Sequence, residues 1–186
     1  MTNSEKFAKI IINNTEEGIE MITGKKVIIK GISKELAGEI YNIVNKEDFR
    51  SLTGTLYPVS EYEHEEWIKR VTCNSEQKLF MVLCKKTNCF LGTIGLKNFD
   101  HKNRNAELFI SLDSPGGYGA DAVETLVEYC FKHLNLHKIY LKVFDYNKKA
   151  ISCYEKAGFI REGILADQHF NDGHYTDVII MGVIAN

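Results

Sequence analysis

The chain has 186 residues, of which 44% are hydrophobic, so it is long enough to bury a core and its length suits a single domain. Its formal net charge of −2 argues against nucleic acid as a main partner, because proteins that hold phosphate backbones carry a clear basic excess. Apolar runs fall short of the roughly 20 residues that a membrane span requires, and the five cysteines lack metal-site spacing, so we expect a cytoplasmic protein with reduced thiols and no membrane contact.

The first part of the chain predicts a short extension followed by the start of the domain. Residues 1–24 combine helix-like apolar spacing with a polar stretch, which predicts an N-terminal extension that is helical or partly mobile. Residues 25–186 contain no repeat and no low-complexity linker, so we expect one domain there. Its first elements are a predicted strand at 26–30 and predicted helices at 33–44 and 61–71.

The middle of the chain changes to a β-type pattern. Apolar and β-branched runs at 79–84, 89–99 and 106–112, separated by polar turns, predict an antiparallel meander. Alternation along the third strand places Glu107, Phe109 and Ser111 on one face. A carboxylate in so apolar a strand needs an explanation: it is either a functional group or a surface or ion-paired glutamate.

The C-terminal part predicts a helix at 119–134, a strand at 137–144, a short helix at 148–157 and closing strands at 159–164 and 175–184. The strand at 106–112, the helix at 119–134 and the strand at 137–144 follow one another closely. Such a βαβ unit has parallel strands.

A glycine cluster precedes the helix at 119–134. Gly116, Gly117 and Gly119 would expose backbone N–H groups at the positive end of the helix dipole, where anionic phosphates bind and glycine permits close approach. A simple tight turn explains the cluster equally well. The lysine and Ser/Thr of a P-loop are missing, which argues against that motif.

A second pattern lies on the predicted helix at 148–157. Asn147, Ala150 and Tyr154 follow one helix face at spacing i, i+3, i+7. Taken singly, Asn147 is explained as an N-cap and Tyr154 as a half-buried core aromatic.

Taken together, these features resemble the GCN5-related N-acetyltransferase (GNAT) family, in particular its ribosomal-protein-alanine and spermidine acetyltransferase branch. The resemblance covers about residues 25–184 and rests on the order and spacing of AELFISL, GGYGADA, YCFKHLNLHKIYLKV, NKKAISCYEKAGF and EGILADQHFNDGHYTDVIIM. It implies an α/β (α+β) fold with a mixed, mostly antiparallel sheet, a splayed pair of parallel strands and flanking helices. It also implies acetyl-CoA as co-substrate, no metal ion, and a primary amine of a small molecule, a polyamine or a protein N-terminus as acceptor.

The resemblance assigns roles to particular residues. The cofactor pyrophosphate would lie on the amides of Gly117, Tyr118, Gly119 and Ala120, and the pantetheine arm would contact the backbone of Phe109, Ile110 and Ser111 and the helix positions Asn147 and Ala150. Tyr154 would protonate the departing thiolate, and the amide near Ile110 would stabilise the polarised carbonyl. Glu107 is our base candidate, acting through water.

The sequence departs from the family pattern at the glycine turn. Ser114 stands where the family usually has Arg or Gln, Pro115 removes one N–H donor, and the link between strand and helix is short. Asp121 adds a carboxylate to the first helical turn, which would repel phosphate unless it points away. These departures motivate an alternative, a non-catalytic acyl-CoA-binding or regulatory module, while a nucleotide-binding protein is a third class.

The acceptor side is less specified. The resemblance places it in the segments 51–67 and 167–175, where Glu61, Glu63, Glu65 and Glu66 would attract a cationic amine or form a solvated helix face. Tyr57, Tyr62 and Trp67 would line a pocket, with Trp67 alternatively in the core. A homodimer is usual for the branch that the chain resembles.

Overall fold

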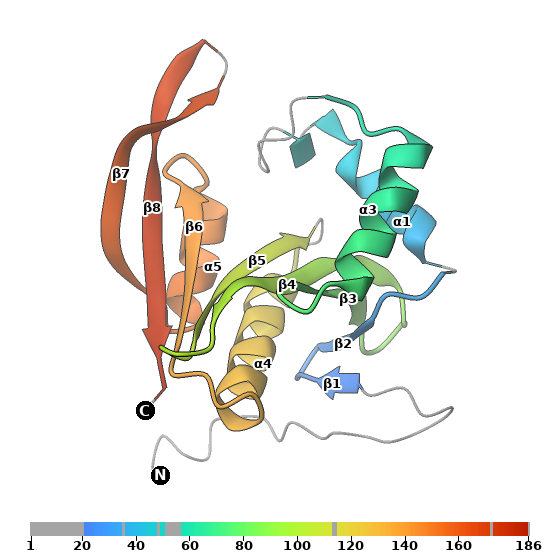
Figure 1. Ribbon diagram of the computed structural model, residues 1–186, viewed down its shortest axis with the longest axis horizontal. Helices are drawn as coiled ribbons and strands as arrows, with labels where there is room; N and C mark the ends of the chain where they lie inside the picture. The colour runs from blue at the N-terminus through green and yellow to red at the C-terminus, as the bar shows by residue number, and fades with distance from the viewer. Residues whose placement is uncertain are drawn as a thin grey trace.

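The computed structural model describes residues 21–34, 36–47, 49–50, 57–112, 115–171 and 173–185. Strands and helices follow one another along these segments as shown in Figure 1. In chain order they are β1 (Met21–Thr23), β2 (Val27–Gly31), α1 (Ala37–Val44), α3 (Glu61–Cys73), β3 (Lys78–Cys84), β4 (Phe90–Asp100), β5 (Asn105–Leu112), α4 (Tyr118–Lys132), β6 (Lys138–Phe144), α5 (Lys148–Lys156), β7 (Ile160–Asn171) and β8 (His174–Ile184).

The strands form one eight-stranded sheet in the order β1-β2-β3-β4-β5-β6-β8-β7. Neighbouring strands are antiparallel except β5 and β6, which α4 connects and which are parallel. This arrangement confirms the expected mixed, mostly antiparallel sheet with one parallel pair and flanking helices. In the described part of the chain, no helix is both long enough and apolar enough to cross a membrane.

The parallel pair separates shortly after it begins. Its register covers Asn105↔Lys138, Ala106↔Ile139 and Glu107↔Tyr140 and ends there, although both strands continue. Beyond Glu107, β5 stays paired with β4 as far as Gly92↔Leu112, and β6 stays paired with β8 as far as Phe144↔Val178. The sheet therefore opens between β5 and β6, which is the splay that the resemblance implied.

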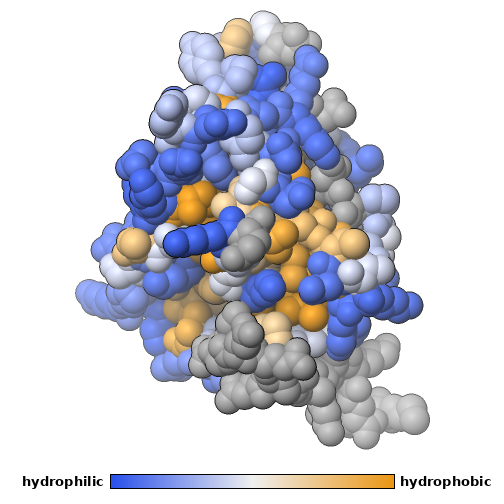
Figure 2. All heavy atoms as spheres, turned by 90° about the vertical axis from the view of Figure 1, so that its right-hand side faces the viewer, coloured by the Kyte–Doolittle hydropathy of each residue, from blue (hydrophilic) through white to orange (hydrophobic). Residues whose placement is uncertain are grey.

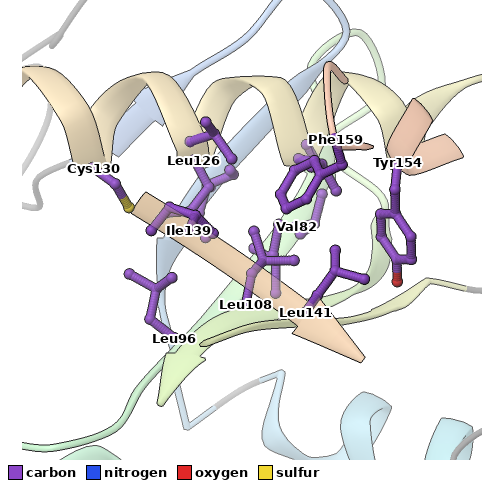
Figure 3. Close-up of a cluster of buried hydrophobic side chains, with 14 of the residues drawn as sticks. Val82, Leu96, Leu108, Leu126, Cys130, Ile139, Leu141, Tyr154 and Phe159 are labelled. Carbon is purple, nitrogen blue, oxygen red and sulfur yellow. The ribbon is translucent and has the colours of Figure 1, made fainter. Parts of the chain in front are cut away.

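The main core lies between the sheet and the helices α4 and α5. Helix α4 presents a buried stripe that includes Ala122, Leu126 and Cys130, as its sequence periodicity predicted. Figure 3 shows this stripe packing on strand side chains, with two aromatic residues from the end of α5 and the loop after it. The labelled residues are Val82, Leu96, Leu108, Leu126, Cys130, Ile139, Leu141, Tyr154 and Phe159.

Helices α1 and α3 pack near β3 and β4 on the other face of the sheet (Figure 1). Helix α3 begins with a capping box, in which the Ser60 hydroxyl accepts from the Glu63 N–H and the Glu63 carboxylate accepts from the Ser60 N–H. His64 is buried between the two helices and its Nε2 lies 2.9 Å from the carbonyl oxygen of Ala37. Polar side chains cover much of this side of the molecule, and apolar atoms gather near its middle (Figure 2).

Two elements differ from the sequence-based expectations. Strand β1 was not predicted: it pairs with β2 inside the segment expected to precede the domain, and three residues are too few to show a period. Strand β7 continues to Asn171, well past the predicted end at 164. The prediction stopped early because a register shift between Leu165 and His169 and a positive φ of 49° at Asp167 interrupt the alternation of the strand. The helix expected within residues 1–24 lies outside the described residues.

Candidate functional site

The glycine turn opens α4 with a backbone that only glycine adopts easily. Gly116 and Gly117 have φ values of 107° and 80°, and Gly117 is the N-cap. Gly117 has no side chain that could accept from the first amides of α4, so its position as N-cap does not consume them. These amides, in Tyr118, Gly119 and Ala120, are donors of the kind that bind an anionic group at the positive end of a helix.

Gly119 has a different role from the two glycines before it. A Cβ atom at this position would lie 3.3 Å from Sγ of Cys153 on α5, closer than most such contacts. Glycine at 119 therefore allows α4 and α5 to approach each other, which brings the glycine turn next to the helix that carries Tyr154.

Tyr118, the first residue of α4, is anchored by its side chain. Its hydroxyl lies 3.7 Å from Sγ of Cys84 at the end of β3. Hydrogen bonding, first from Thr87 and also from Tyr118, lowers the pKa of Cys84 to about 7, and the same contact raises the pKa of the Tyr118 phenol. The phenol is thus directed toward β3, and the Tyr118 backbone faces the turn.

Asp121 points away from the glycine turn. Its Oδ2 accepts hydrogen bonds from the N–H groups of Lys26 (2.7 Å) and Val27 (3.0 Å), and its Oδ1 accepts from that of Lys25 (3.1 Å). The carboxylate is buried and fastens the end of the β1–β2 hairpin to the first turn of α4. Because the carboxylate points away from the turn, Asp121 is compatible with a phosphate there.

Three neighbouring positions of β5, Phe109, Ile110 and Ser111, were expected to contact the pantetheine arm through their backbone. Of these three, Ile110 directs its backbone groups into the opening between β5 and β6. Arg104 directs its carbonyl toward β6, where it accepts from the Lys138 N–H at 3.3 Å. Backbone groups alternate in direction along a strand, so those of Ile110 also face the opening. Phe109 and Ser111 lie opposite Gly95 and Thr93 and direct their backbone groups to β4.

Tyr154 lies on α5 within the main core and is 7% exposed. Its ring packs near Phe159, with 6.0 Å between centroids, and Figure 3 shows its hydroxyl pointing away from α5 and past Leu141. Burial, and after it the neighbouring Cys153, raises the pKa of the Tyr154 phenol above its usual value. A phenol is protonated at neutral pH even at its usual pKa of 10.0, and the raised pKa leaves Tyr154 in this form, which a proton donor requires.

Asn147 and Ala150 meet at the start of α5. The Asn147 side chain accepts a hydrogen bond from the Ala150 N–H at 3.1 Å, so Asn147 is the N-cap of this helix. The cap uses Oδ1 and leaves the amide nitrogen as a donor. Asn147 can cap α5 and also donate to a ligand.

Glu107 lies at the last paired position before the strands separate, on the face opposite Tyr154. Its side chain is 7% exposed and pairs with Nζ of Lys97 at 3.3 Å, while Nδ2 of Asn98 donates to its Oε2 at 2.8 Å. Burial, and after it the Glu107 charge, raises the pKa of the adjacent Tyr140 phenol. Glu107 thus has the partner that is expected if it is an ion-paired glutamate and not a catalytic base.

The residues considered for the acceptor side are divided by the structure. Glu63 belongs to the capping box and Glu66 pairs with Lys69 at 2.8 Å, so both have local partners. Tyr57 and Tyr62 are more than three-quarters exposed, while Trp67 is partly buried 5.7 Å from His64. Ser114 and residues 51–56 lie outside the described residues.

An aromatic stack that sequence reasoning missed lies at the end of β6. The rings of Phe144 and His169 stack at 3.9 Å, and Tyr146 lies 5.4 Å from Phe144. Asp145 Oδ1 and His169 Nε2 are buried there and have no hydrogen-bond partner among the described residues. The contact between the Phe144 and His169 rings depends on the register shift in β7, which a local sequence pattern does not predict.

Within the ranges given above, no three His, Cys, Asp or Glu side chains gather into a group that could hold a metal ion.

Comparison with known proteins identifies a matching family and several relatives. The model of the acetyltransferase (GNAT) domain matches residues 26–160. Spermidine N(1)-acetyltransferase of Vibrio cholerae is 31% identical over 121 residues, which is 64% of this chain and 70% of the relative. The enzyme of the same name from Escherichia coli K12 is 36% identical over 116 residues, 61% of each chain.

The fold has close relatives among solved structures. The crystal structure of spermidine N-acetyltransferase from Vibrio cholerae in complex with CoA and spermine superposes with a TM-score of 0.78 at 27% identity. The superposition covers 86% of this chain and 95% of that one.

Proposed function

Because the chain belongs to the acetyltransferase (GNAT) family, we propose that it transfers the acetyl group of acetyl-CoA to a primary amine of a small cationic molecule, with polyamines as the first candidates. The observation that carries the proposal is the opening between β5 and β6 next to the glycine turn of α4. The relatives' names support a polyamine acceptor, since both sequence relatives described above are spermidine acetyltransferases.

The residues of this chain fit acetyl-CoA. Gly116 and Gly117 hold a turn with positive φ at a helix start, which suits a pyrophosphate. The backbone of Ile110 faces the opening, as a pantetheine arm that pairs like an added strand requires. The proposed backbone contact on β5 thus narrows to Ile110, while Phe109 and Ser111 support it by pairing with β4.

When bound, acetyl-CoA supplies the acetyl group as an activated thioester. The Ile110 N–H would donate to the thioester carbonyl, and Asn147 would donate from its amide nitrogen to the pantetheine arm, beside Ala150. The Tyr154 hydroxyl, kept protonated by burial, would give its proton to the thiolate that leaves.

Glu107 stays our proposed base, acting through water on the protonated amine. Glu107 and Tyr154 lie on opposite faces of the sheet on either side of the opening, so an amine can approach from one face while the thiol departs on the other. The ion pair with Lys97 is the competing role of Glu107.

The acceptor is proposed to approach on the face of the sheet that carries Glu107. On this face the end of β6 provides the stacked rings of Phe144 and Tyr146, and an ammonium group is attracted to aromatic faces. Next to them, the buried Oδ1 of Asp145 has no hydrogen-bond partner in the part of the chain that the structure describes, and it would accept from an ammonium group.

The test is an assay of thiol release from acetyl-CoA with a panel of amines: spermidine, spermine and a peptide with a free N-terminal alanine. We expect turnover with the two polyamines above the rate without amine. Turnover with the peptide alone would overturn the acceptor class and keep the reaction.

The alternative of a non-catalytic acyl-CoA-binding module keeps one supporting observation, Ser114 at the position where the family has Arg or Gln. Calorimetry with acetyl-CoA separates the two functions. Binding without turnover on any amine would favour the module, and absence of binding would overturn both.

A further inference from the structure

The β1–β2 hairpin is held in a fixed position against the glycine turn. Asp121 accepts three backbone hydrogen bonds from Lys25, Lys26 and Val27, at 2.7 to 3.1 Å. The hairpin approaches α4 so closely that a Cβ atom at Gly24 would lie 2.3 Å from Oγ1 of Thr125. The hairpin is also fixed from β3, because the Lys85 N–H donates to the Lys26 carbonyl at 2.8 Å.

This attachment places one ammonium group at the glycine turn. Nζ of Lys26 donates to the carbonyl oxygen of Gly116 at 3.0 Å, and a Cβ atom at Gly117 would lie 3.4 Å from the same Nζ. The charge therefore lies beside the two residues that have positive φ and immediately before the first amides of α4.

We propose that Lys26 binds the pyrophosphate of acetyl-CoA together with the glycine turn, and so supplies a side-chain contact of the kind that the family obtains from Arg or Gln at the position of Ser114. The inference rests on the proposed function, because it assumes that this turn receives the cofactor. An ammonium group has three N–H donors and the Gly116 carbonyl takes one, so two remain to meet phosphate oxygens without loss of the turn.

The local charge balance gives this lysine its importance. Asp121 contributes a negative charge within the first turn of α4, and even a carboxylate that points away reduces the attraction of the helix start for an anion. Lys26 restores a positive charge beside Gly116 and Gly117. A phosphate would replace water around an ammonium group that is already positioned, which reduces the ordering cost of binding.

Lys25 provides a matched control on the same hairpin. Its backbone is held by the same carboxylate, but its Nζ pairs with Oε2 of Glu124 at 3.1 Å instead of reaching the turn. Lys25→Gln and Lys26→Gln remove the same charge from adjacent positions, so they differ in the contact with the turn and not in net charge.

The experiment is calorimetric titration of wild type, Lys26→Gln, Lys26→Arg and Lys25→Gln with CoA and with 3′-dephospho-CoA. We expect Lys26→Gln to raise the Kd for both ligands by about 5- to 10-fold, the effect of one charge-assisted hydrogen bond at a solvent-exposed site. Lys26→Arg and Lys25→Gln should stay within about twofold of wild type. The wild-type Kd should also depend more steeply on salt than that of Lys26→Gln.

Three results would overturn the inference. Equal Kd values for Lys26→Gln and Lys25→Gln would show that general charge and not the contact with the turn matters. An effect seen with CoA but lost with 3′-dephospho-CoA would move the contact to the ribose phosphate. Failure of wild type to bind either ligand would overturn the proposed function itself, which the first two results leave intact.

Discussion

At the scale of single residues, the proposed chemistry depends on two side chains in contrasting environments. Tyr154 is enclosed by the core, and its hydroxyl points toward the end of the cluster at Leu141. Glu107 is also buried, yet it has a charged partner in Lys97 and a hydrogen-bond donor in Asn98. Burial thus raises the pKa of the phenol, and the oxygens of the carboxylate are satisfied by their two partners.

Tyr154→Phe removes the proposed proton donor and leaves the ring in place. We expect kcat to fall by about 100-fold with little change in the Kd for acetyl-CoA, because the hydroxyl acts on the leaving thiolate and not on binding. Steady-state kinetics and calorimetry measure the two quantities. Tyr129→Phe on α4 is the control and should leave both unchanged. Parallel losses of kcat and affinity in Tyr154→Phe would assign Tyr154 a packing role.

Glu107→Gln tests the proposed base against the ion-paired role. If Glu107 is the base, Glu107→Gln should lower kcat by about 100-fold. Lys97→Gln is the matched control, because it breaks the same ion pair at 3.3 Å and keeps the carboxylate. If both variants lose the same activity and stability, the carboxylate is structural and the base must lie elsewhere.

At the scale of elements, the site depends on contacts between segments distant in sequence. The turn before α4 meets the hairpin of β1 and β2 through Asp121, about 95 positions along the chain from its partners. Helix α5 approaches α4 because Gly119 leaves room for Cys153. The opening beside these elements exists because β5 and β6 each remain paired on their outer sides after they separate.

Asp121→Asn should loosen the hairpin from α4. The amide keeps one acceptor oxygen in place of a carboxylate that receives three N–H groups, so we expect the free energy of unfolding to fall by about 2 kcal/mol. Amide hydrogen exchange of Lys25, Lys26 and Val27 should accelerate more than that of the sheet centre.

Glu124→Gln is the control for this variant. It breaks an ion pair with Lys25 at 3.1 Å whose side chains are 34% and 51% exposed, and it should change stability by less than about 0.5 kcal/mol. Equal effects of the two substitutions would contradict the proposed anchoring role of Asp121.

At the scale of the whole molecule, one continuous core joins α4, α5 and the sheet, and it encloses groups that ionise at high pH. Burial raises the pKa of the Cys130 thiol to about 12 and raises that of the Tyr154 phenol as well. Both groups keep their protons in the folded protein and release them more readily when the chain unfolds. The contribution of the buried thiol to the free energy of unfolding is therefore fully present below the usual thiol pKa of 9.0, and it is lost as the pH rises from there toward 12.

Cys130→Ala should flatten this alkaline loss of stability. One proton that the folded state keeps and the unfolded state releases contributes about 1.4 kcal/mol per pH unit to the slope. Urea unfolding at several pH values between 9 and 11 measures the free energy of unfolding, and the slope is compared instead of the absolute value because the smaller side chain also leaves a cavity. Cys73→Ala, at an exposed thiol, should keep the wild-type slope. An unchanged slope in Cys130→Ala would show that Cys130 titrates alike in both states.

The sequence by itself determined most of the elements and the nature of the site. Periodicity gave α3, α4, α5 and the strands β3 to β6 close to their observed bounds, because each buries a regular face. The short connection through α4 required β5 and β6 to be parallel. The glycines before α4 and the pattern of Asn147 and Tyr154 indicated the two sides of the proposed cofactor site.

Only the tertiary structure decided how these parts are completed. It placed Lys26 at the glycine turn, turned Asp121 toward the hairpin, and gave Glu107 its partners Lys97 and Asn98. Of Phe109, Ile110 and Ser111, the tertiary structure left Ile110 with its backbone facing the opening between β5 and β6. Sequence periods report the face that a residue presents within its own element. Hydrogen bonds and ion pairs between distant segments depend on how the sheet closes, for which a local pattern carries no signal.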